Sequence, residues 1–109
     1  RAGSGGDGEF RGGNGQEVLI ESRAPGPLTV AFLAERTRAE AAPAGIAGGG
    51  AGAPGEIVIG DRRVDPKTQH VLEPGGTVIM RTPAGGGYGP PERRTRERME
   101  ADRADGYVE

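Results

Sequence analysis

The sequence of 109 residues contains no cysteine. This absence excludes disulfides, thiolate metal sites and a cysteine nucleophile within the chain. It is also typical of proteins that work in a reducing compartment, so we expect a cytoplasmic protein. No apolar run approaches the roughly 20 residues that a transmembrane helix needs, and we therefore expect no membrane partner.

Charge of one sign and large apolar side chains are also scarce. The chain has 14 Lys and Arg against 16 Asp and Glu, a net charge of −2, which gives no support to nucleic-acid binding. Val, Ile, Leu and Phe make up 18 of the 109 residues, whereas Gly and Pro make up 31. Because the apolar residues are clustered, we predict a folded chain with a small core that rests against a partner domain.

The residue types that usually carry catalysis form no recognisable set. His70 is the only histidine, it lies in an alternating stretch, and no second histidine or cysteine could complete a metal site. No pair of carboxylates has a spacing that suggests acid–base chemistry, and no Gly-x-Ser-x-Gly motif is present. We therefore assign no catalytic residue and no metal ligand, and we expect His70 to have a structural role.

Alternation of apolar and polar residues predicts a mainly β fold. We expect five or six short antiparallel strands in one or two small sheets, with long glycine-rich loops and one C-terminal α-helix. The stretches QEVLIES (16–22) and LTVAFLAE (28–35) are expected to pair with each other. A hairpin is expected over residues 69–82, because Pro74 and Gly75 suit the two central positions of a type II turn.

The chain divides into four parts by composition. Residues 1–15 are a glycine-rich lead-in, 16–82 the β region, 83–91 a Gly/Pro elbow, and 92–105 a helix. Within the β region, residues 36–55 lack any pattern and form a loop longer than compact domains usually contain.

The predicted helix has a proline entrance and a glycine exit. Pro91 suits a first helical position, and Gly106 suits a C-terminal stop. Oppositely charged residues lie four apart, as in the pair Arg98 and Asp102, which favours a solvated helix on the surface.

The stretch TPAGGGYGPPERR (82–94) is the candidate functional loop, with Gly85, Gly86, Gly87, Tyr88 and Gly89 as its candidate site residues. A phosphate-binding loop is disfavoured, because no Lys-Ser/Thr pair follows and the glycine spacing differs from that of dinucleotide-binding loops. We expect the glycines to turn the backbone sharply and Tyr88 to pack into the body of the domain. Whether the loop lines a substrate pocket stays open.

Four stretches in this order resemble the C-terminal part of the hydantoinase B / 5-oxoprolinase family: GSGGDGEFRGGNGQE (3–17), PAGIAGGGAGAPG (43–55), LEPGGTVIMRTPAGGGYGPPERR (72–94) and DRADGYV (102–108). That family typically ends in a Thr-Pro-Gly-Gly-Gly-Gly-Tyr-Gly-Asp-Pro run followed by a charged helix. Ala84 stands here for a family glycine and Pro90 for the aspartate. The first change implies that position 84 needs no positive φ, and the second removes a carboxylate that could cap a helix.

The resemblance implies that residues 1–109 form the C-terminal β-rich module of a longer subunit, such as an N-methylhydantoinase B subunit. The implied activity is ATP-dependent opening of a cyclic amide, a hydantoin or 5-oxoproline, with the isolated segment inactive. A hydantoinase A-like subunit or domain is the implied ATP-binding partner, and ATP and a divalent metal belong to the parent assembly. Two alternatives remain: a fragment of an acetone or acetophenone carboxylase subunit, and a non-catalytic module for subunit assembly.

Overall fold

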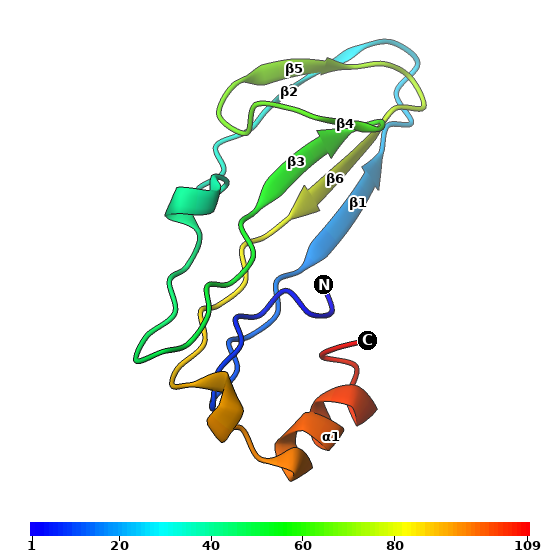
Figure 1. Ribbon diagram of the computed structural model, residues 1–109. Coiled ribbons are helices and arrows are strands. Elements are labelled where there is room, and N and C mark those ends of the chain that lie inside the picture. Colours follow the sequence, from blue (N-terminus) through cyan, green and yellow to red (C-terminus); the bar gives the residue numbers. More distant parts are fainter.

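The computed structural model describes residues 1–109, apart from the side chain of Ala39, and confirms the mainly β fold (Figure 1). Its six strands are short, and it has one α-helix, as expected. The elements in chain order are β1 (Glu17–Glu21), β2 (Leu28–Ala31), the 3-10 turn η1 (Ala39–Ala41), β3 (Glu56–Ile59), β4 (Arg62–Arg63), β5 (Gln69–Leu72), β6 (Thr77–Arg81), the 3-10 turn η2 (Pro91–Arg93) and α1 (Arg96–Ala104).

The strands form two antiparallel sheets. Strands β1, β6, β3 and β4 form a four-stranded sheet in that order, and β2 pairs with β5. The expected pairing of the first two strands is therefore wrong: β1 pairs with β6. The physical reason is that β2 directs Val30 against the core from the opposite layer, so the two strands cannot be neighbours in one sheet.

The expected hairpin over residues 69–82 is also corrected. The turn itself forms as predicted, because Gly75 has a φ of 77° and the amide of Gly76 donates to Glu73 O at 2.8 Å. However, the strands on either side of the turn enter different sheets. Leu72 and Val78 are both buried and meet from opposite layers, so the turn joins layers rather than paired strands.

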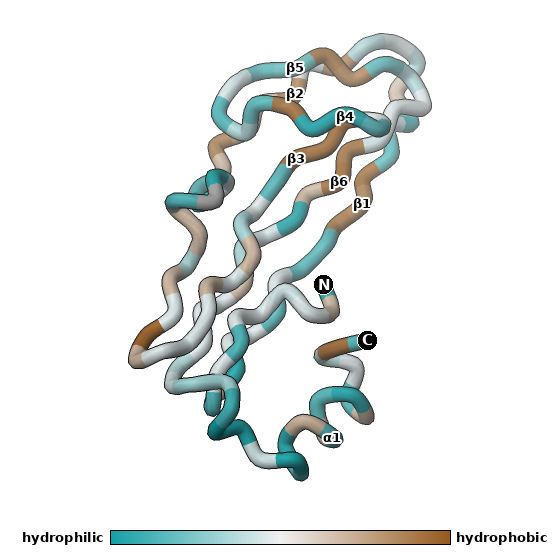
Figure 2. The backbone as a smooth tube through the Cα atoms, viewed as in Figure 1, coloured by the Kyte–Doolittle hydropathy of each residue, from teal (hydrophilic) through white to brown (hydrophobic). Residues whose placement is uncertain are grey.

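The hydrophobic core is small and lies between the two sheets. Ile57, Leu72 and Val78 are its buried centre. Half-buried apolar residues surround this centre: Val30, Phe32, Ala34, Ile59, Val64 and Met80. Figure 2 shows the apolar residues gathered on the strands, whereas the long segments beyond the four-stranded sheet are mostly pale or hydrophilic. The hydrophobic core therefore stabilises only the end of the molecule that contains the strands.

The molecule is long and thin, with principal extents of 53 × 29 × 15 Å. Its radius of gyration is 16.7 Å, against about 13 Å for a compact chain of this length. It exposes 7100 Å², whereas a compact monomer of this mass exposes about 5,700 Å². The chain thus carries more surface than an independent globular protein of its size.

The C-terminal helix is shorter than expected. Pro91–Arg93 forms a separate 3-10 turn, and Arg94 is extended, with φ −67° and ψ 129°. Helix α1 then begins after Thr95, whose hydroxyl accepts from the amide of Arg98 at 3.2 Å. Gly106, with φ 79°, ends the helical segment as predicted. Of the helices described, none is both long enough and apolar enough to cross a membrane.

Candidate functional site

The glycine-rich segments lie side by side beyond the four-stranded sheet (Figure 1). We call residues 4–15, 43–55 and 82–89 the glycine bundle. The last of these segments continues in line from β6, whereas the others lead into β1 and β3. The same runs of chain therefore form a sheet at one end and the glycine bundle at the other.

The candidate loop lies inside this bundle and does not behave as a strand in a ladder. The amides of Ala84 and Gly87 donate to the carbonyls of Ala53 and Gly50, at 3.0 and 2.9 Å. Between these two bonds, the donor position moves three residues forward along the chain, from 84 to 87, and the acceptor position moves three residues back, from 53 to 50. In a β-ladder the bonds to one neighbour would recur every second residue instead.

A second set of hydrogen bonds, made to the first segment of the bundle, has the same three-residue spacing. The amides of Gly85 and Tyr88 donate to the carbonyls of Gly13 and Phe10, at 2.8 and 2.9 Å. Gly89 donates in turn to Ile46 O at 2.9 Å. A repeat of three residues, with every bond made to another segment, is the geometry of a polyproline II-type helix. Residues 84–89 are thus the hydrogen-bonded centre of the bundle.

Close contact between backbones explains why the bundle needs glycine. A Cβ on Gly86 would overlap the carbonyl of Ala44, and one on Gly87 would overlap the carbonyl of Asp7. These neighbours are backbone atoms, and the carbonyl of Asp7 also accepts from the amide of Gly50 at 2.7 Å, so they cannot move aside as a flexible side chain would. A side chain at either position would force the segments apart.

The expected elbow is corrected by this arrangement. Gly85, Gly86 and Gly87 have no positive φ, and only Gly89, at 78°, has one. The sequence suggested a turn because glycine allows one. Here the absence of a side chain instead allows neighbouring backbone segments to lie close together. Ala84 is buried without a positive φ, as its substitution for glycine implied.

Tyr88 does not pack into the body of the chain, and this expectation is wrong for the structure of the 109 residues. Its side chain is 53% exposed and lies on the bundle surface beside Phe10 and Ile46, which are also exposed. The Phe10 and Tyr88 ring centroids are 6.1 Å apart, and the guanidinium of Arg98 lies 4.8 Å above the Phe10 ring. We call Phe10, Ile46 and Tyr88 the apolar platform.

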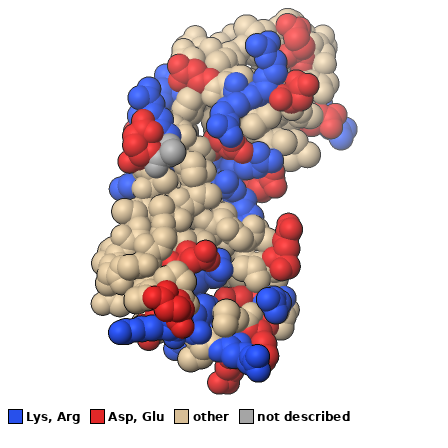
Figure 3. Space-filling model, viewed as in Figure 1, with Lys and Arg blue, Asp and Glu red and all other residues tan. Residues whose placement is uncertain are grey.

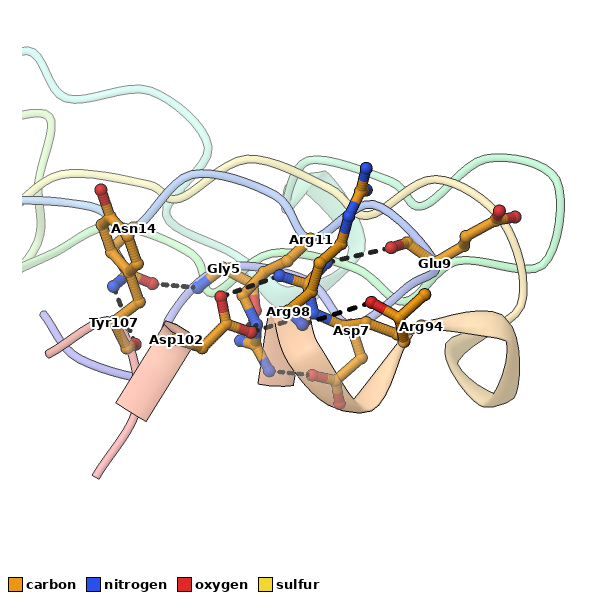
Figure 4. Close-up of polar contacts among 10 residues, drawn as sticks. Gly5, Asp7, Glu9, Arg11, Asn14, Arg94, Arg98, Asp102 and Tyr107 are labelled. Atoms are coloured by element: carbon orange, nitrogen blue, oxygen red, sulfur yellow. Dashed lines mark hydrogen bonds and ion pairs between the residues drawn. The ribbon is translucent and has the colours of Figure 1, made fainter. Parts of the chain in front are cut away.

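A group of charged side chains fastens the helix to the bundle (Figure 4). The buried carboxylate of Asp102 accepts from Arg94 Nε and a terminal guanidinium nitrogen, at 2.9 and 2.8 Å. Arg11 Nε lies 3.4 Å from the same carboxylate, and Arg11 also pairs with Asp7 at 2.7 Å. We call Asp7, Arg11, Arg94 and Asp102 the polar clamp.

The polar clamp was missed by the sequence analysis, which expected Asp102 to pair with Arg98. Arg94, whose backbone is extended and which lies ahead of the helix, binds Asp102 instead. It also donates to Glu9 O at 3.0 Å. No spacing rule on a helix predicts such contacts, because they join segments far apart in the chain. The only sequence signal was an arginine, Arg11, set inside a glycine run.

The candidate loop lines neither of two clefts found among the described residues. The larger, of about 380 Å³, lies between residues 35–38, 55–57 and 63–67, and Ala41 also lines it. The smaller, of about 340 Å³, adjoins the polar clamp. On the face shown in Figure 3, charged side chains gather toward both ends, and few lie over the middle of the molecule.

No metal site emerges from the parts of the chain that the structure describes, because they hold no group of three or more His, Cys, Asp or Glu side chains suited to a metal ion. His70 is half-buried, its Nε2 lies 2.8 Å from Asp65 O, and its ring is 5.9 Å from that of Phe32. These contacts are those of a structural histidine.

A row of ion pairs crosses the four-stranded sheet. Arg81 bridges Glu17, at 2.8 Å, and Glu56, which also pairs with Arg63 at 2.6 Å. The hydrogen bond from Arg81, together with the charge of Arg63, outweighs the effect of burial and lowers the pKa of Glu56. These ion pairs link side chains of all four strands, β1, β6, β3 and β4.

The regions that match known proteins extend over nearly the whole chain. The family model described as hydantoinase B/oxoprolinase matches residues 1–91. The beta subunit of caprolactamase from Pseudomonas jessenii is 35% identical over 96% of this chain and 19% of its own length. The 5-oxoprolinase PfmaA from Pestalotiopsis fici is 34% identical over 100% of this chain and 8% of its own length. The chain thus spans about a fifth or less of these relatives, and no solved structure matches it.

Proposed function

Because this chain belongs to the hydantoinase B/oxoprolinase family, we propose that it forms part of a hydrolase subunit that opens cyclic amides with ATP. The observation that supports this proposal is the likeness to a caprolactamase subunit and to a 5-oxoprolinase, which extends over almost all of the 109 residues. Hydantoins and 5-oxoproline are the substrates proposed, and the compartment proposed is the cytoplasm.

Within that enzyme we propose a structural role for the chain. The described residues present no set of His, Cys, Asp or Glu side chains suited to a metal ion, so they do not fit a divalent metal, and we derive no chemical step here. The chain's surface exceeds that of a compact monomer by about 1,400 Å², which is ample for a stable interface. The glycine bundle supplies a stiff body, and the apolar platform supplies a contact surface for other segments.

The partners proposed are the rest of a longer subunit and a hydantoinase A-like ATP-binding subunit or domain. The caprolactamase relative is a beta subunit, which supports an assembly of more than one chain. ATP and the metal are assigned to those other parts. Gly85–Gly89 would line a substrate pocket only where such a partner closes over them.

The test is an assay of the complete polypeptide with its A-type partner and MgATP. Ring opening of hydantoin, 5-oxoproline or caprolactam, coupled to ATP hydrolysis, is the expected result. ATP-dependent carboxylation of acetone or acetophenone would replace the proposal with the carboxylase alternative. We expect the purified 109 residues to be inactive in both assays, and ring opening by them alone would contradict the structural role.

A further inference from the structure

Strand β1 is an open and apolar edge of the four-stranded sheet. It is an outer strand of that sheet, and all five of its residues are exposed. Its centre carries three consecutive apolar side chains, Val18, Leu19 and Ile20, which are 41%, 65% and 45% exposed. Such an edge is a ready template for pairing with another strand.

The hydrogen bonds at the two ends of β1 show which backbone groups face outward. Thr82 N donates to Gln16 O, and Ser22 N donates to Gly76 O, each at 2.9 Å. Residues 16 and 22 therefore occupy bonded pairs with β6. Bonded and non-bonded pairs alternate along an antiparallel ladder, so the intervening even positions, 18 and 20, are also bonded to β6.

It follows that Glu17, Leu19 and Glu21 direct their N–H and C=O groups away from β6, toward the open edge. No other segment among the described residues bonds to these groups. The usual protections of an edge are also missing, since β1 contains no proline and its register with β6 has no bulge. Its remaining protection is charge.

The two carboxylates on β1 differ in their surroundings. Glu17 is already paired with Arg81, at 2.8 Å. Glu21 has no ion-pair partner in the part of the chain that the structure describes. In a symmetric antiparallel pair of two β1 strands, Glu17 of one copy would face Glu21 of the other. Like charges directly opposite are destabilising, which disfavours a second copy as the occupant.

We propose that β1 accepts an added β-strand from a segment of the larger subunit outside these 109 residues. The donated strand carries apolar side chains on both faces, to match Val18 and Ile20 on one face and Leu19 on the other, and it places a Lys or Arg opposite Glu21. This proposal rests on the proposed function, in which the chain is part of a longer protein. The matched part makes up 19% of the caprolactamase relative, so most of such a subunit remains to supply the strand.

Residue-resolved hydrogen–deuterium exchange on the complete subunit in its assembly tests the added strand. The amide of Leu19 should exchange at least 100-fold slower than an unprotected amide, like that of Val18, which bonds to β6. Fast exchange at Leu19 beside slow exchange at Val18 would overturn the proposal. The readout is independent of ring opening, so an inactive assembly with a protected edge would contradict the proposed function alone.

Three variants of the same assembly test the added strand and its occupant. Leu19→Pro removes one outward N–H and leaves the bonds to β6, so protection should fall at residues 17 and 21 but not at 18. Leu19→Thr keeps the N–H and the β propensity and should retain protection. Glu21→Lys should speed exchange at Leu19 about tenfold if a basic residue faces it. Slower exchange in that variant would identify a second copy as the occupant and overturn the proposal.

Discussion

Phe10 and Tyr88 exchange two backbone hydrogen bonds, of 3.0 and 2.9 Å, and this pairing presents both rings on the surface of the glycine bundle. Ile46 joins them from a third segment. Three segments that carry almost no side chains thus bring their large apolar residues to one place. A stiff support and an exposed apolar surface are what a docking contact needs.

The first prediction concerns Tyr88→Ala. Because the ring is 53% exposed, the variant should lower the free energy of unfolding of the 109 residues by about 1 kcal/mol or less. In the complete assembly, lost turnover with normal stability would favour a pocket role, and lost stability with normal turnover would favour a packing role. Tyr107→Ala, which truncates a tyrosine that is 52% exposed outside the platform, is the matched control. No effect of Tyr88→Ala on either quantity would eliminate both roles.

A second prediction tests the close packing of the glycine bundle. Gly86→Ala places a methyl group against the backbone of Ala44 and Gly45 and should destabilise the chain by about 2 kcal/mol or more. Gly13→Ala is the control, because its Cβ would meet nothing within 4 Å and its φ is not positive. That control should be neutral or slightly stabilising. Equal urea midpoints for the two variants would show that the segments are not in close contact in solution.

The sequence predicted those parts of the fold that depend on local patterns. Alternation located every strand except the two-residue β4, Gly75 located a turn, and Gly106 located the end of the helix. Each of these signals resides within a few neighbouring residues. The choice of strand partners could not be read in the same way, because it depends on how side chains such as Val30 and Val78 meet across the core.

The glycine bundle was the least predictable part. Periodicity is detected through apolar and polar side chains, and a run of glycines has none, so its period of three leaves no trace in the sequence. The polar clamp was hidden for another reason. Asp102 has arginines at several helical spacings, and only the extended backbone at Arg94 decides which of them reaches it.

A third prediction addresses the polar clamp. Asp102→Asn removes the buried charge that receives two bonds from Arg94, and it should destabilise the attachment of α1 by about 3 kcal/mol. The effect should be local, seen as faster amide exchange across α1 with little change in β6. Glu100→Gln, an exposed substitution on the same helix, should leave exchange unchanged. Unchanged exchange in Asp102→Asn would mean that other contacts hold the helix.

The last prediction uses the ion pairs on the sheet. The pKa of Glu56 is lowered, chiefly by the hydrogen bond from Arg81 and further by the charge of Arg63. The folded state therefore binds a proton at this carboxyl less readily than the unfolded state does. Its contribution to stability is complete above the unfolded pKa of about 4.3, and it is lost as the pH falls through the lower folded pKa.

Glu56→Gln should accordingly lower the free energy of unfolding at pH 7, and its difference from the unmutated chain should shrink as the pH falls from about 5 to about 3. Glu73→Gln is the control, because Glu73 is exposed and takes part in no ion pair among the described residues. Its difference should stay small throughout. Denaturant unfolding at several pH values measures both differences. A Glu56→Gln difference that stays constant with pH would show that Arg81 does not hold the carboxylate in its charged form, and the register of β3 with β6 would then rest on backbone bonds and the Ile57–Val78 core contacts alone.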